Sequence, residues 1–240
     1  MRPFFSFYGS KYRMAARLPA PRYATVVEPF AGSMGYSTRH EPPIAIGVER
    51  DPVIAGLWGW LIGADEAEVL NLPPVLPGDD LRCLLLSDAE RALIGLWINK
   101  GMTAPCNVPS KWMREYETTK PETFWGAPVR ERIADQLHKI RSWSMYEGQW
   151  FEAPDVEGTW FIDAPYRSKP GYRYTYGPDQ IDYGLLAEWC RSRRGQVIVC
   201  ERAGADWLPF RPVDFDVKAA RNGGTGYSPE AIWTNDMEDS

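Results

Sequence analysis

The chain is predicted to fold as an α/β protein with a mainly parallel sheet and an antiparallel edge near its C-terminus. Residues 25–49 have the order strand, glycine-containing loop, helix and strand, which is typical of a Rossmann-like, nucleotide-type βαβ unit. Buried-strand patterns then alternate with helical patterns along the chain. Two late apolar runs, 213–217 and 231–234, suit strands joined through residues 222–224, which adds an antiparallel edge.

The βαβ unit is the first predicted structure along the chain. Residues 25–28 (Thr-Val-Val-Glu) are expected to form a short buried strand, followed by the loop 29–35 (Pro-Phe-Ala-Gly-Ser-Met-Gly) and a helix. Residues 44–49 (Ile-Ala-Ile-Gly-Val-Glu) form the next strand. Asp51 and Pro52 then open another helix, because proline is tolerated in the first helical turn.

Two more helices are predicted in the middle of the chain. Residues 87–90 have the spacing of a capping box, and Gly101 provides a stop after the apolar face that follows. That face carries Leu93, Trp97 and Ile98. The second helix starts at Pro128, and its apolar positions follow helical spacing. They are Val129, Ile133, Leu137 and Ile140.

The remaining elements lie in the C-terminal half. Residues 159–162 and 196–200 are short apolar runs typical of buried strands. Between them, Asp182 is expected to cap a helix that ends at Gly195 after a basic run. The apolar positions of that helix are Leu185, Leu186 and Trp189.

Composition limits the classes of function. The 240 residues are 44% hydrophobic and carry a net charge of -5, with a pI of about 5.2. The chain can therefore bury a substantial core, and its acidity argues mildly against a protein that coats itself with nucleic acid. The longest apolar run, 53–64, is shorter than the ~20 residues of a membrane-spanning helix, and the start of the chain does not resemble a signal peptide. We expect a soluble, cytoplasmic protein with no membrane partner.

Cysteine and histidine spacing argues against a disulfide framework or a metal site. The four cysteines, at positions 83, 106, 190 and 200, include no CxxC pair. The two histidines, at positions 40 and 138, form no cluster with them. We expect reduced thiols and chemistry that needs no metal.

Basic and aromatic side chains are interleaved in the irregular stretch 101–125 and its flank. They are Lys100, Lys111, Trp112, Arg114, Tyr116, Lys120 and Trp125. A second group occurs within residues 163–194, which contain six basic residues, among them Arg167 and Lys169, and four acidic residues. Such mixtures suit nucleic-acid contact. A loop that covers the core, or a solvated charged face, explains the same composition.

The most informative motif is Asp163-Ala164-Pro165-Tyr166, directly after the predicted strand 159–162. A carboxylate, a rigid X-Pro bond and an aromatic ring can hold a flat heterocycle by its face and its exocyclic amino group. We expect Asp163 to be an exposed loop carboxylate. Because Asp and Pro are common turn residues, these four residues alone also fit an ordinary strand-ending turn.

Two further motifs precede this one along the chain. Residues 3–11 read Pro-Phe-Phe-Ser-Phe-Tyr-Gly-Ser-Lys, and residues 28–35 read Glu-Pro-Phe-Ala-Gly-Ser-Met-Gly. In this order the three motifs resemble the Gly-Gly-Lys segment, the glycine loop and the Asp-Pro-Pro-Tyr catalytic loop of Dam-like (D12 class) adenine-specific DNA methyltransferases. Ala164 stands where the family has its first proline. The resemblance covers most of the chain and thins between about residues 65 and 130.

The resemblance implies a methyltransferase fold that binds S-adenosylmethionine and releases S-adenosylhomocysteine. Glu49 lies 17 positions after Gly32, near the ~20-residue offset at which an acidic side chain meets ribose hydroxyls. Gly32 would let the backbone approach the cofactor, and Lys11 would close over its methionine end. The residues expected to contact the cofactor are Tyr8, Gly9, Lys11, Glu28, Pro29, Phe30, Ala31, Gly32, Glu49 and Asp163.

The same resemblance implies double-stranded DNA as partner, with the target adenine flipped out of the helix. Tyr166 would stack on the base, while the Asp163 carboxylate and the Ala164 carbonyl accept hydrogen bonds from its amino group. Pro165 biases Ala164 toward extended backbone. These four residues, 163–166, are the expected catalytic group. The residues expected to contact DNA are Lys100, Lys111, Arg114, Arg167 and Lys169.

The predicted domain bounds follow from the middle of the chain, where members of the family vary with their target. Residues 1–64 and 127–240 are expected to form the cofactor-binding catalytic domain, and residues 65–126 a helical, loop-rich target-recognition insertion. The resemblance further implies a monomer or weak dimer in a bacterial or phage-infected cell. The recognition sequence does not follow from composition.

Several alternatives remain open at the level of sequence. Ala164 and the acidic pI fit a catalytically weakened protein of the same fold that binds the cofactor or nucleic acid. Methylation of cytosine N4 or of RNA uses similar geometry. A nicotinamide-dependent oxidoreductase would need G-x-G-x-x-G, which residues 30–35 lack. A cytosine ring-carbon methyltransferase would use Cys106 as nucleophile, although no strand leads to it.

Overall fold

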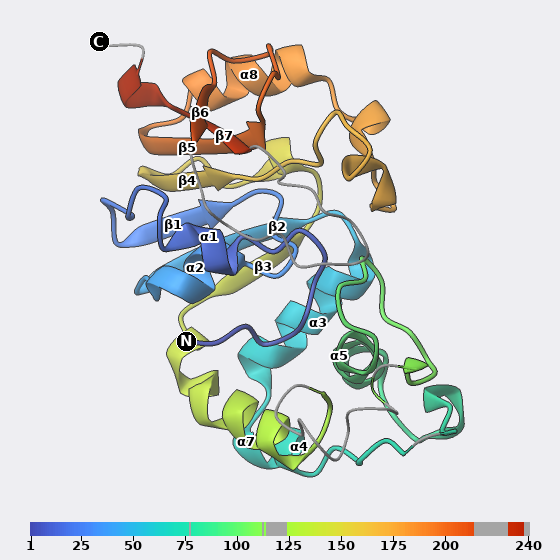
Figure 1. The fold of residues 1–240 in the computed structure, drawn as a ribbon. Helices are drawn as coiled ribbons and strands as arrows, with labels where there is room; N and C mark the ends of the chain where they lie inside the picture. Colours follow the sequence, from blue (N-terminus) through green and yellow to red (C-terminus); the bar gives the residue numbers. More distant parts are fainter. Residues whose placement is uncertain (77, 112, 114–123, 214–229, 238–240) are drawn as a thin grey trace.

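A seven-stranded sheet forms the centre of the fold, in the order β3-β2-β1-β4-β5-β7-β6 (Figure 1). The computed structural model describes residues 1–76, 78–111, 113, 124–213 and 230–237. The strands are β1 (Thr25–Glu28), β2 (Ile44–Glu49), β3 (Ser144–Glu147), β4 (Gly158–Ile162), β5 (Gly195–Arg202), β6 (Arg211–Val213) and β7 (Glu230–Thr234).

The prediction of an α/β chain with a mainly parallel sheet and an antiparallel C-terminal edge is confirmed. Strands β3, β2, β1, β4 and β5 pair in parallel, whereas β7 runs antiparallel to both β5 and β6. The order up to β5 is that of a doubly wound Rossmann-like sheet, with β7 inserted before β6. Of the predicted strand 213–217, Val213 ends β6, and residues 214–217 and 222–224 lie outside the described residues.

Strand β3 was not predicted from the sequence. Its residues Ser-Met-Tyr-Glu are only partly buried, and Tyr146 is 49% exposed. An edge strand of this kind lacks the apolar run by which the central strands were found. It nevertheless pairs in register with β2, from Ile46 opposite Ser144 to Glu49 opposite Glu147.

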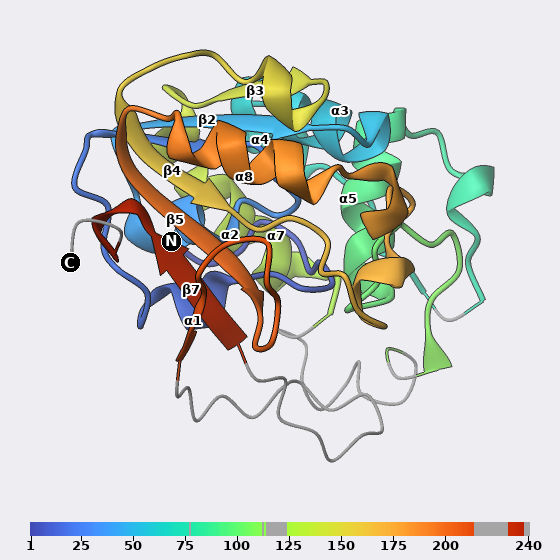
Figure 2. The same cartoon turned by 90° about the horizontal axis from the view of Figure 1, so that it is seen from above.

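Alternating side chains give the sheet two buried faces, because successive residues of a strand point in opposite directions. Val27, Trp160 and Val197 are neighbours in register and pack against α8. Phe161 and Ile198 point to the other face, where they pack in a cluster with α1 and α2. Figure 2 shows α8 lying across the sheet from above. The fold thus has three layers, with helices on both sides of the sheet.

The helices differ in how well the sequence located them. They are α1 (Tyr12–Ala15), α2 (Gly35–His40), α3 (Pro52–Gly63), α4 (Glu66–Leu70), α5 (Asp88–Ile98), α7 (Ala127–Gln136) and α8 (Tyr183–Arg191). The predicted capping box at Ser87 and the cap at Asp182 are confirmed. The predicted helix from Pro128 stops at Gln136, and its last two apolar positions continue in a 3-10 turn. Leu185 was wrongly placed on the apolar face of α8, since it is 53% exposed.

Helices α3, α4, α5 and α7 form a group at one side of the sheet, beside β2 and β3 (Figure 1). Their apolar side chains share one cluster with Phe4 and Phe5, and both of these rings pack against Trp58 of α3. The expected insertion 65–126 therefore packs against helices that lie outside its predicted bounds. Its assignment as a separate domain stays a prediction. Within the described ranges, every helix falls short of the length and apolarity that crossing a membrane requires.

The carboxyl ends of β1 and β4 are where a ligand crevice is expected. The chain passes from β1 to β2 on one side, while β4 lies on the other side of β1. In open α/β sheets such a reversal of strand order leaves a crevice at the carboxyl ends of the strands. Two of the three motifs follow these strands directly, residues 28–35 after β1 and residues 163–166 after β4.

Candidate functional site

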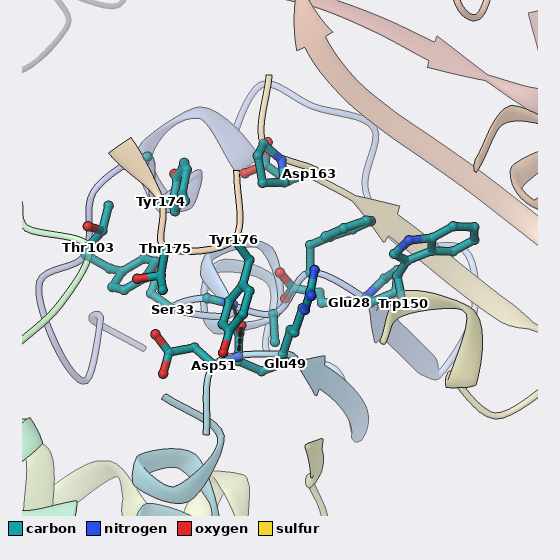
Figure 3. A pocket seen from close by; sticks show the side chains of 18 of the residues that line it. Glu28, Ser33, Glu49, Asp51, Thr103, Trp150, Asp163, Tyr174, Thr175 and Tyr176 are labelled. Atoms are coloured by element: carbon teal, nitrogen blue, oxygen red, sulfur yellow. Dashed lines mark hydrogen bonds between the residues drawn. The ribbon is translucent and has the colours of Figure 1, made fainter. Parts of the chain in front are cut away.

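A pocket opens at the carboxyl ends of β1, β2 and β4 (Figure 3). It encloses about 960 Å³ of space between its lining residues, open solvent at its mouth included. In Figure 3, Asp163 lies at one end and Glu49 at the other. All ten residues expected to contact a cofactor line this pocket, namely Tyr8, Gly9, Lys11, Glu28, Pro29, Phe30, Ala31, Gly32, Glu49 and Asp163.

The glycine loop is held from both sides. Ala31 N donates to the carbonyl of Val48 at 3.0 Å, and Trp58 Nε1 donates to the carbonyl of Gly32 at 2.8 Å. Gly32 has a φ of +45°, and a Cβ there would lie 3.2 Å from the ring of Phe7. Glycine is therefore required by the backbone conformation and by a protein ring, whatever ligand the pocket accepts.

Glu49 ties the second strand to this loop. Its Oε2 accepts a hydrogen bond from Gly32 N at 2.8 Å, and its Oε1 accepts one from Asp51 N at 2.9 Å. Burial raises the pKa of Glu49, and these two backbone donors oppose the shift. A carboxylate oxygen can accept more than one hydrogen bond. Glu49 is therefore fixed in place and still able to accept from ligand hydroxyls.

Glu28, at the end of β1, is the most buried carboxyl of the pocket lining. It is 3% exposed, and its Oε1 accepts a hydrogen bond from Ser37 N of α2 at 2.8 Å. Burial raises the pKa of Glu28 to about 7. Its protonation state therefore changes near neutral pH.

An aromatic wall lies on the Glu28 side of the pocket (Figure 3). Phe30 stacks on Trp150, with ring centroids 6.4 Å apart and planes at 24°. Both rings line the pocket. Sequence reasoning found Phe30 in the glycine loop but missed Trp150, which lies in a short 3-10 turn after β3 with no motif around it.

Lys11 and Asp163 form an ion pair at the other end. Lys11 Nζ lies 2.8 Å from Asp163 Oδ1 and 3.0 Å from Oδ2, and it donates to the Gly9 carbonyl at 3.2 Å. The Asp163 side chain is only 20% exposed. The expectation of an exposed loop carboxylate was therefore wrong, because the segment 3–11 crosses over the end of β4 and places its lysine there.

The electrostatics of this pair follow from burial and from neighbouring carboxylates. Burial alone would lower the pKa of Lys11, but Asp163 and Glu230 outweigh it and hold that pKa above its ordinary value. Burial raises the pKa of Asp163, while the Lys11 ammonium opposes the shift. Lys11 is thus held firmly in its charged form.

The rest of the expected catalytic group is placed differently from Asp163. Pro165 lines the pocket, whereas Ala164 and Tyr166 do not. Ala164 is 3% exposed and packs in the cluster under α8. Tyr166 is 8% exposed, with Lys11 Nζ 4.8 Å from its ring centroid. Its hydroxyl donates to Glu230 Oε2 at 2.5 Å, a partner that sequence reasoning missed.

The N-terminal segment 3–11 is anchored on the glycine loop. Ser33 Oγ and Ser10 Oγ lie 2.8 Å apart in a hydrogen bond. At Gly35, a Cβ would lie 2.8 Å from Tyr12 N and 3.0 Å from Lys11 N. The absent side chain of Gly35 therefore lets the segment that carries Lys11 approach the loop.

A strap of residues 171–181 contributes a further part of the lining. Tyr174 and Tyr176 line the pocket; the Tyr174 hydroxyl donates to the Tyr8 carbonyl at 3.1 Å, and the Arg50 guanidinium lies 4.3 Å from the Tyr176 ring centroid. Sequence reasoning did not select these residues. The tyrosine-rich stretch soon after Asp163 was the signal available for them.

The expected DNA contacts do not line the pocket. Lys100, Lys111, Arg167 and Lys169 are exposed, and Arg114 lies outside the described residues. Lys100 Nζ is 5.1 Å from the centroid of Trp97, and the Arg167 guanidinium is 5.5 Å from that of Tyr183. Cys106, considered as a nucleophile, also lies outside the pocket lining. Among the described residues, no group of three His, Cys, Asp or Glu side chains could hold a metal ion.

Comparison with known protein families and curated proteins identified no relative of the chain. No model of a known protein family matches the chain, and no curated protein matches it. Function has therefore to be argued from the pocket itself.

The close approach at Gly35 predicts a loss of stability when a side chain is added. Gly35→Ala should lower the free energy of unfolding by roughly 1–3 kcal/mol, because backbone atoms must shift. Gly56→Ala is the control, since a Cβ at Gly56 in α3 meets nothing within 4 Å and should stabilise the helix by up to ~1 kcal/mol. Urea unfolding of both variants tests this, and equal stabilities would refute the close approach.

Burial of Glu28 predicts a pH-dependent stability. The pKa of about 7 exceeds the ordinary value of 4.5, so the folded protein keeps a proton that the unfolded chain has lost. This contribution is fully present below about pH 4.5 and is lost as the pH rises through 7. It amounts to roughly 3 kcal/mol, at ~1.4 kcal/mol per pKa unit.

The Glu28→Gln variant isolates this effect, because its amide oxygen can still accept from Ser37 N. From pH 4.5 to pH 8, the unfolding free energy of the wild type should fall relative to that of Glu28→Gln by that amount. Urea unfolding at several pH values measures the difference. Parallel pH profiles of the two proteins would contradict the assignment.

Proposed function

We propose that this chain is an S-adenosylmethionine-dependent DNA methyltransferase of the Dam-like class, acting on the N6 amino group of adenine. One observation carries the proposal. Lys11, the loop 28–35 and Asp163 are separated by up to 152 positions in the chain and meet around a single pocket. The loop and Asp163 follow parallel strands that end at one edge of the sheet, whereas Lys11 belongs to a segment that follows no strand and meets them there.

The pocket lining fits the proposed cofactor. The stacked Phe30 and Trp150 offer an apolar surface for a flat ring system, and Glu49 can accept from ribose hydroxyls. The carboxyl groups of the lining outnumber its cationic side chains. They are Glu28, Glu49, Asp51 and Asp163, against Lys11 and Arg50.

Such an acidic lining suits a ligand that carries positive charge. S-adenosylmethionine supplies a methyl group bound to a positively charged sulfur. Lys11, at the Asp163 end of the pocket, is placed to meet the carboxylate of the same ligand. The pocket lining thus has carboxylates to match the positively charged sulfur of the cofactor, and an ammonium group to match its carboxylate.

Asp163 would act on the target amine. Its carboxylate accepts hydrogen bonds, so an amino group bound there is oriented with its nitrogen lone pair toward the methyl donor. When the new C–N bond forms, the bond between the methyl carbon and the sulfur breaks, and S-adenosylhomocysteine leaves with that electron pair. The amine loses one proton, which Asp163 would accept. In the present structure Lys11 contacts both carboxylate oxygens, and each oxygen keeps a lone pair that can accept from the amine.

Ala164 is compatible with this role. The group required from position 164 is its backbone carbonyl, and its side chain is packed in the cluster under α8. The next carbonyl, of Pro165, accepts a hydrogen bond from the Tyr183 hydroxyl. Packing and this hydrogen bond support the loop where the family has a proline ring.

The direct test is methyl transfer to nucleic acid. The protein is incubated with S-adenosylmethionine labelled in its methyl group and with DNA free of methyladenine, and the nucleosides are then separated and identified by mass spectrometry. The proposal expects labelled N6-methyl-2′-deoxyadenosine from DNA. Label in N4-methylcytosine, or label only when RNA is supplied, would replace the substrate. Cofactor binding without label in any nucleic acid would favour the catalytically weakened alternative.

Replacing Asp163 by asparagine predicts a selective loss of turnover. Asp163→Asn should lower kcat by about 10²–10⁴-fold, because the amide cannot take up the proton. Asparagine is preferred to alanine, since its amide oxygen can still accept a hydrogen bond from Lys11. The substitution still removes the charge that Lys11 pairs with, so a loss of stability of up to about 3–5 kcal/mol is expected. The matched control is Asp155→Asn, a change in a carboxylate that is 64% exposed and pairs with Arg193 and Arg194.

Circular dichroism and urea unfolding establish that both variants are folded before rates are compared. The double variant Lys11→Met with Asp163→Asn removes the two charges of the pair together. Full activity of a folded Asp163→Asn protein would contradict the proposed role.

A further inference from the structure

The hydroxyl of Tyr166 is held by a residue outside all three motifs. It donates to Oε2 of Glu230 at 2.5 Å. Glu230 is partly buried, and burial raises the pKa of this carboxyl, opposed by the nearby Lys11 ammonium. Hydrogen bonds of neutral donors to charged acceptors are about twice as strong as those between neutral groups. The contact is therefore a strong restraint on the end of the Tyr166 ring.

The direction of β7 explains why Glu230 reaches this site. The parallel strands end at the edge of the sheet where the pocket lies, and β7 runs antiparallel to β5. Its first residue, Glu230, pairs with Arg202, the last residue of β5. An antiparallel strand thus begins at the edge where the parallel strands end, and its first side chain becomes available to the site.

The backbone of Tyr166 is restrained independently. Ser168 N donates to the Tyr166 carbonyl at 2.7 Å. Gly171 packs so closely that a Cβ there would lie 1.9 Å from the same carbonyl oxygen. Tyr166 is therefore held at its backbone by residues 168–171 and at its hydroxyl by Glu230.

Tyr166 also acts on Asp163. The Tyr166 ring and the Asp163 carboxylate flank the same Lys11 ammonium, which lies 4.8 Å from the ring centroid and 2.8 Å from Asp163 Oδ1. In the structure the hydroxyl donates to Glu230. A hydroxyl donates one proton at a time, so donation to Glu230 leaves Asp163 open to other donors.

We propose that Glu230 is a positioning residue, which fixes the Tyr166 ring for the target base and keeps its hydroxyl from occupying Asp163. The inference rests on the proposed function, which puts the amine at Asp163, and on the family resemblance, which implies that the base stacks on the Tyr166 ring. It adds a residue of the antiparallel edge to a site otherwise built from the ends of parallel strands. Loss of Glu230 frees the Tyr166 ring and lets its hydroxyl compete with the target amine for the Asp163 carboxylate.

The experiment is a double-mutant cycle with Glu230→Ala and Tyr166→Phe. Steady-state methyl transfer from S-adenosylmethionine to DNA free of methyladenine gives kcat and KM for each protein. Glu230→Ala should lower kcat/KM for DNA by roughly 10- to 100-fold, the range for losing a hydrogen bond to a charged group. The KM for S-adenosylmethionine should change less than about threefold. Glu230→Gln should restore part of the loss, because its amide oxygen still accepts.

In Tyr166→Phe no hydroxyl remains to be positioned, so adding Glu230→Ala should cause little further loss. The urea midpoints of the same four proteins provide a readout that needs no cofactor, and they too should be non-additive. The matched control is Glu157→Ala, which removes a carboxylate bonded to the Tyr23 hydroxyl ahead of β4 and should leave kcat/KM unchanged.

The outcomes separate this inference from the proposed function. An active wild type in which Glu230→Ala keeps full kcat/KM, or in which the two substitutions act additively on kcat/KM, overturns the positioning role and leaves the proposed function standing. Coupled urea midpoints with unchanged kinetics also overturn it, because the contact is then structural only. A wild type that methylates no nucleic acid overturns the proposed function, and the positioning role with it.

Discussion

The ion pair between Lys11 and Asp163 is the contact around which the site is built. It joins the N-terminal segment 3–11 to the end of β4, 152 positions away. The same ammonium lies over the Tyr166 ring and hydrogen-bonds the Gly9 carbonyl. Removing one partner of such a buried pair leaves an uncompensated charge, at about 3–5 kcal/mol. The pair therefore constrains the path of the segment and the position of the Asp163 carboxylate together.

The rest of the pocket follows from sheet topology. Parallel strands bring the residues that follow β1, β2 and β4 to one edge, where Glu49 bonds the backbone of the glycine loop. The antiparallel β7 adds its first residue to the same edge. On the far side of the loop, Trp58 of α3 fixes the Gly32 carbonyl. Core packing of the helical group is thus linked directly to the shape of the site.

Local sequence patterns predicted the parts of the fold that depend on local interactions. The βαβ unit, the capping box at Ser87 and the cap at Asp182 were found because each is encoded within a few residues. The predicted cofactor residues of the loop 28–35, Glu49 and Asp163 were brought together in the pocket because they end or follow buried strands. Tyr8, Gly9 and Lys11 reach it by the path of the N-terminal segment. Strand β3 was missed because an exposed edge strand has no apolar run, and Leu185 was misplaced because helical spacing alone does not say which of two adjacent leucines faces the core.

The features that sequence could not supply are contacts between distant segments. The burial of Asp163 depends on where the segment 3–11 crosses β4, and Glu230 reaches Tyr166 only because β7 is antiparallel. Trp150, Tyr174 and Tyr176 line the pocket from irregular backbone without a motif. Each of these is set by the assembled sheet and not by neighbours in the chain. Together they supply an aromatic wall, a strap and a positioning carboxylate to the site. The sequence alone revealed only the three motifs of that site.

The proposed function requires this pocket to bind S-adenosylmethionine with its reacting end toward Asp163. A crystal structure of the protein grown with saturating S-adenosylhomocysteine tests it most directly. The product is expected in this pocket, with its ribose hydroxyls on Glu49 and its sulfur at the Asp163 end. An empty pocket at saturating ligand, or the ligand bound elsewhere on the protein, would contradict it.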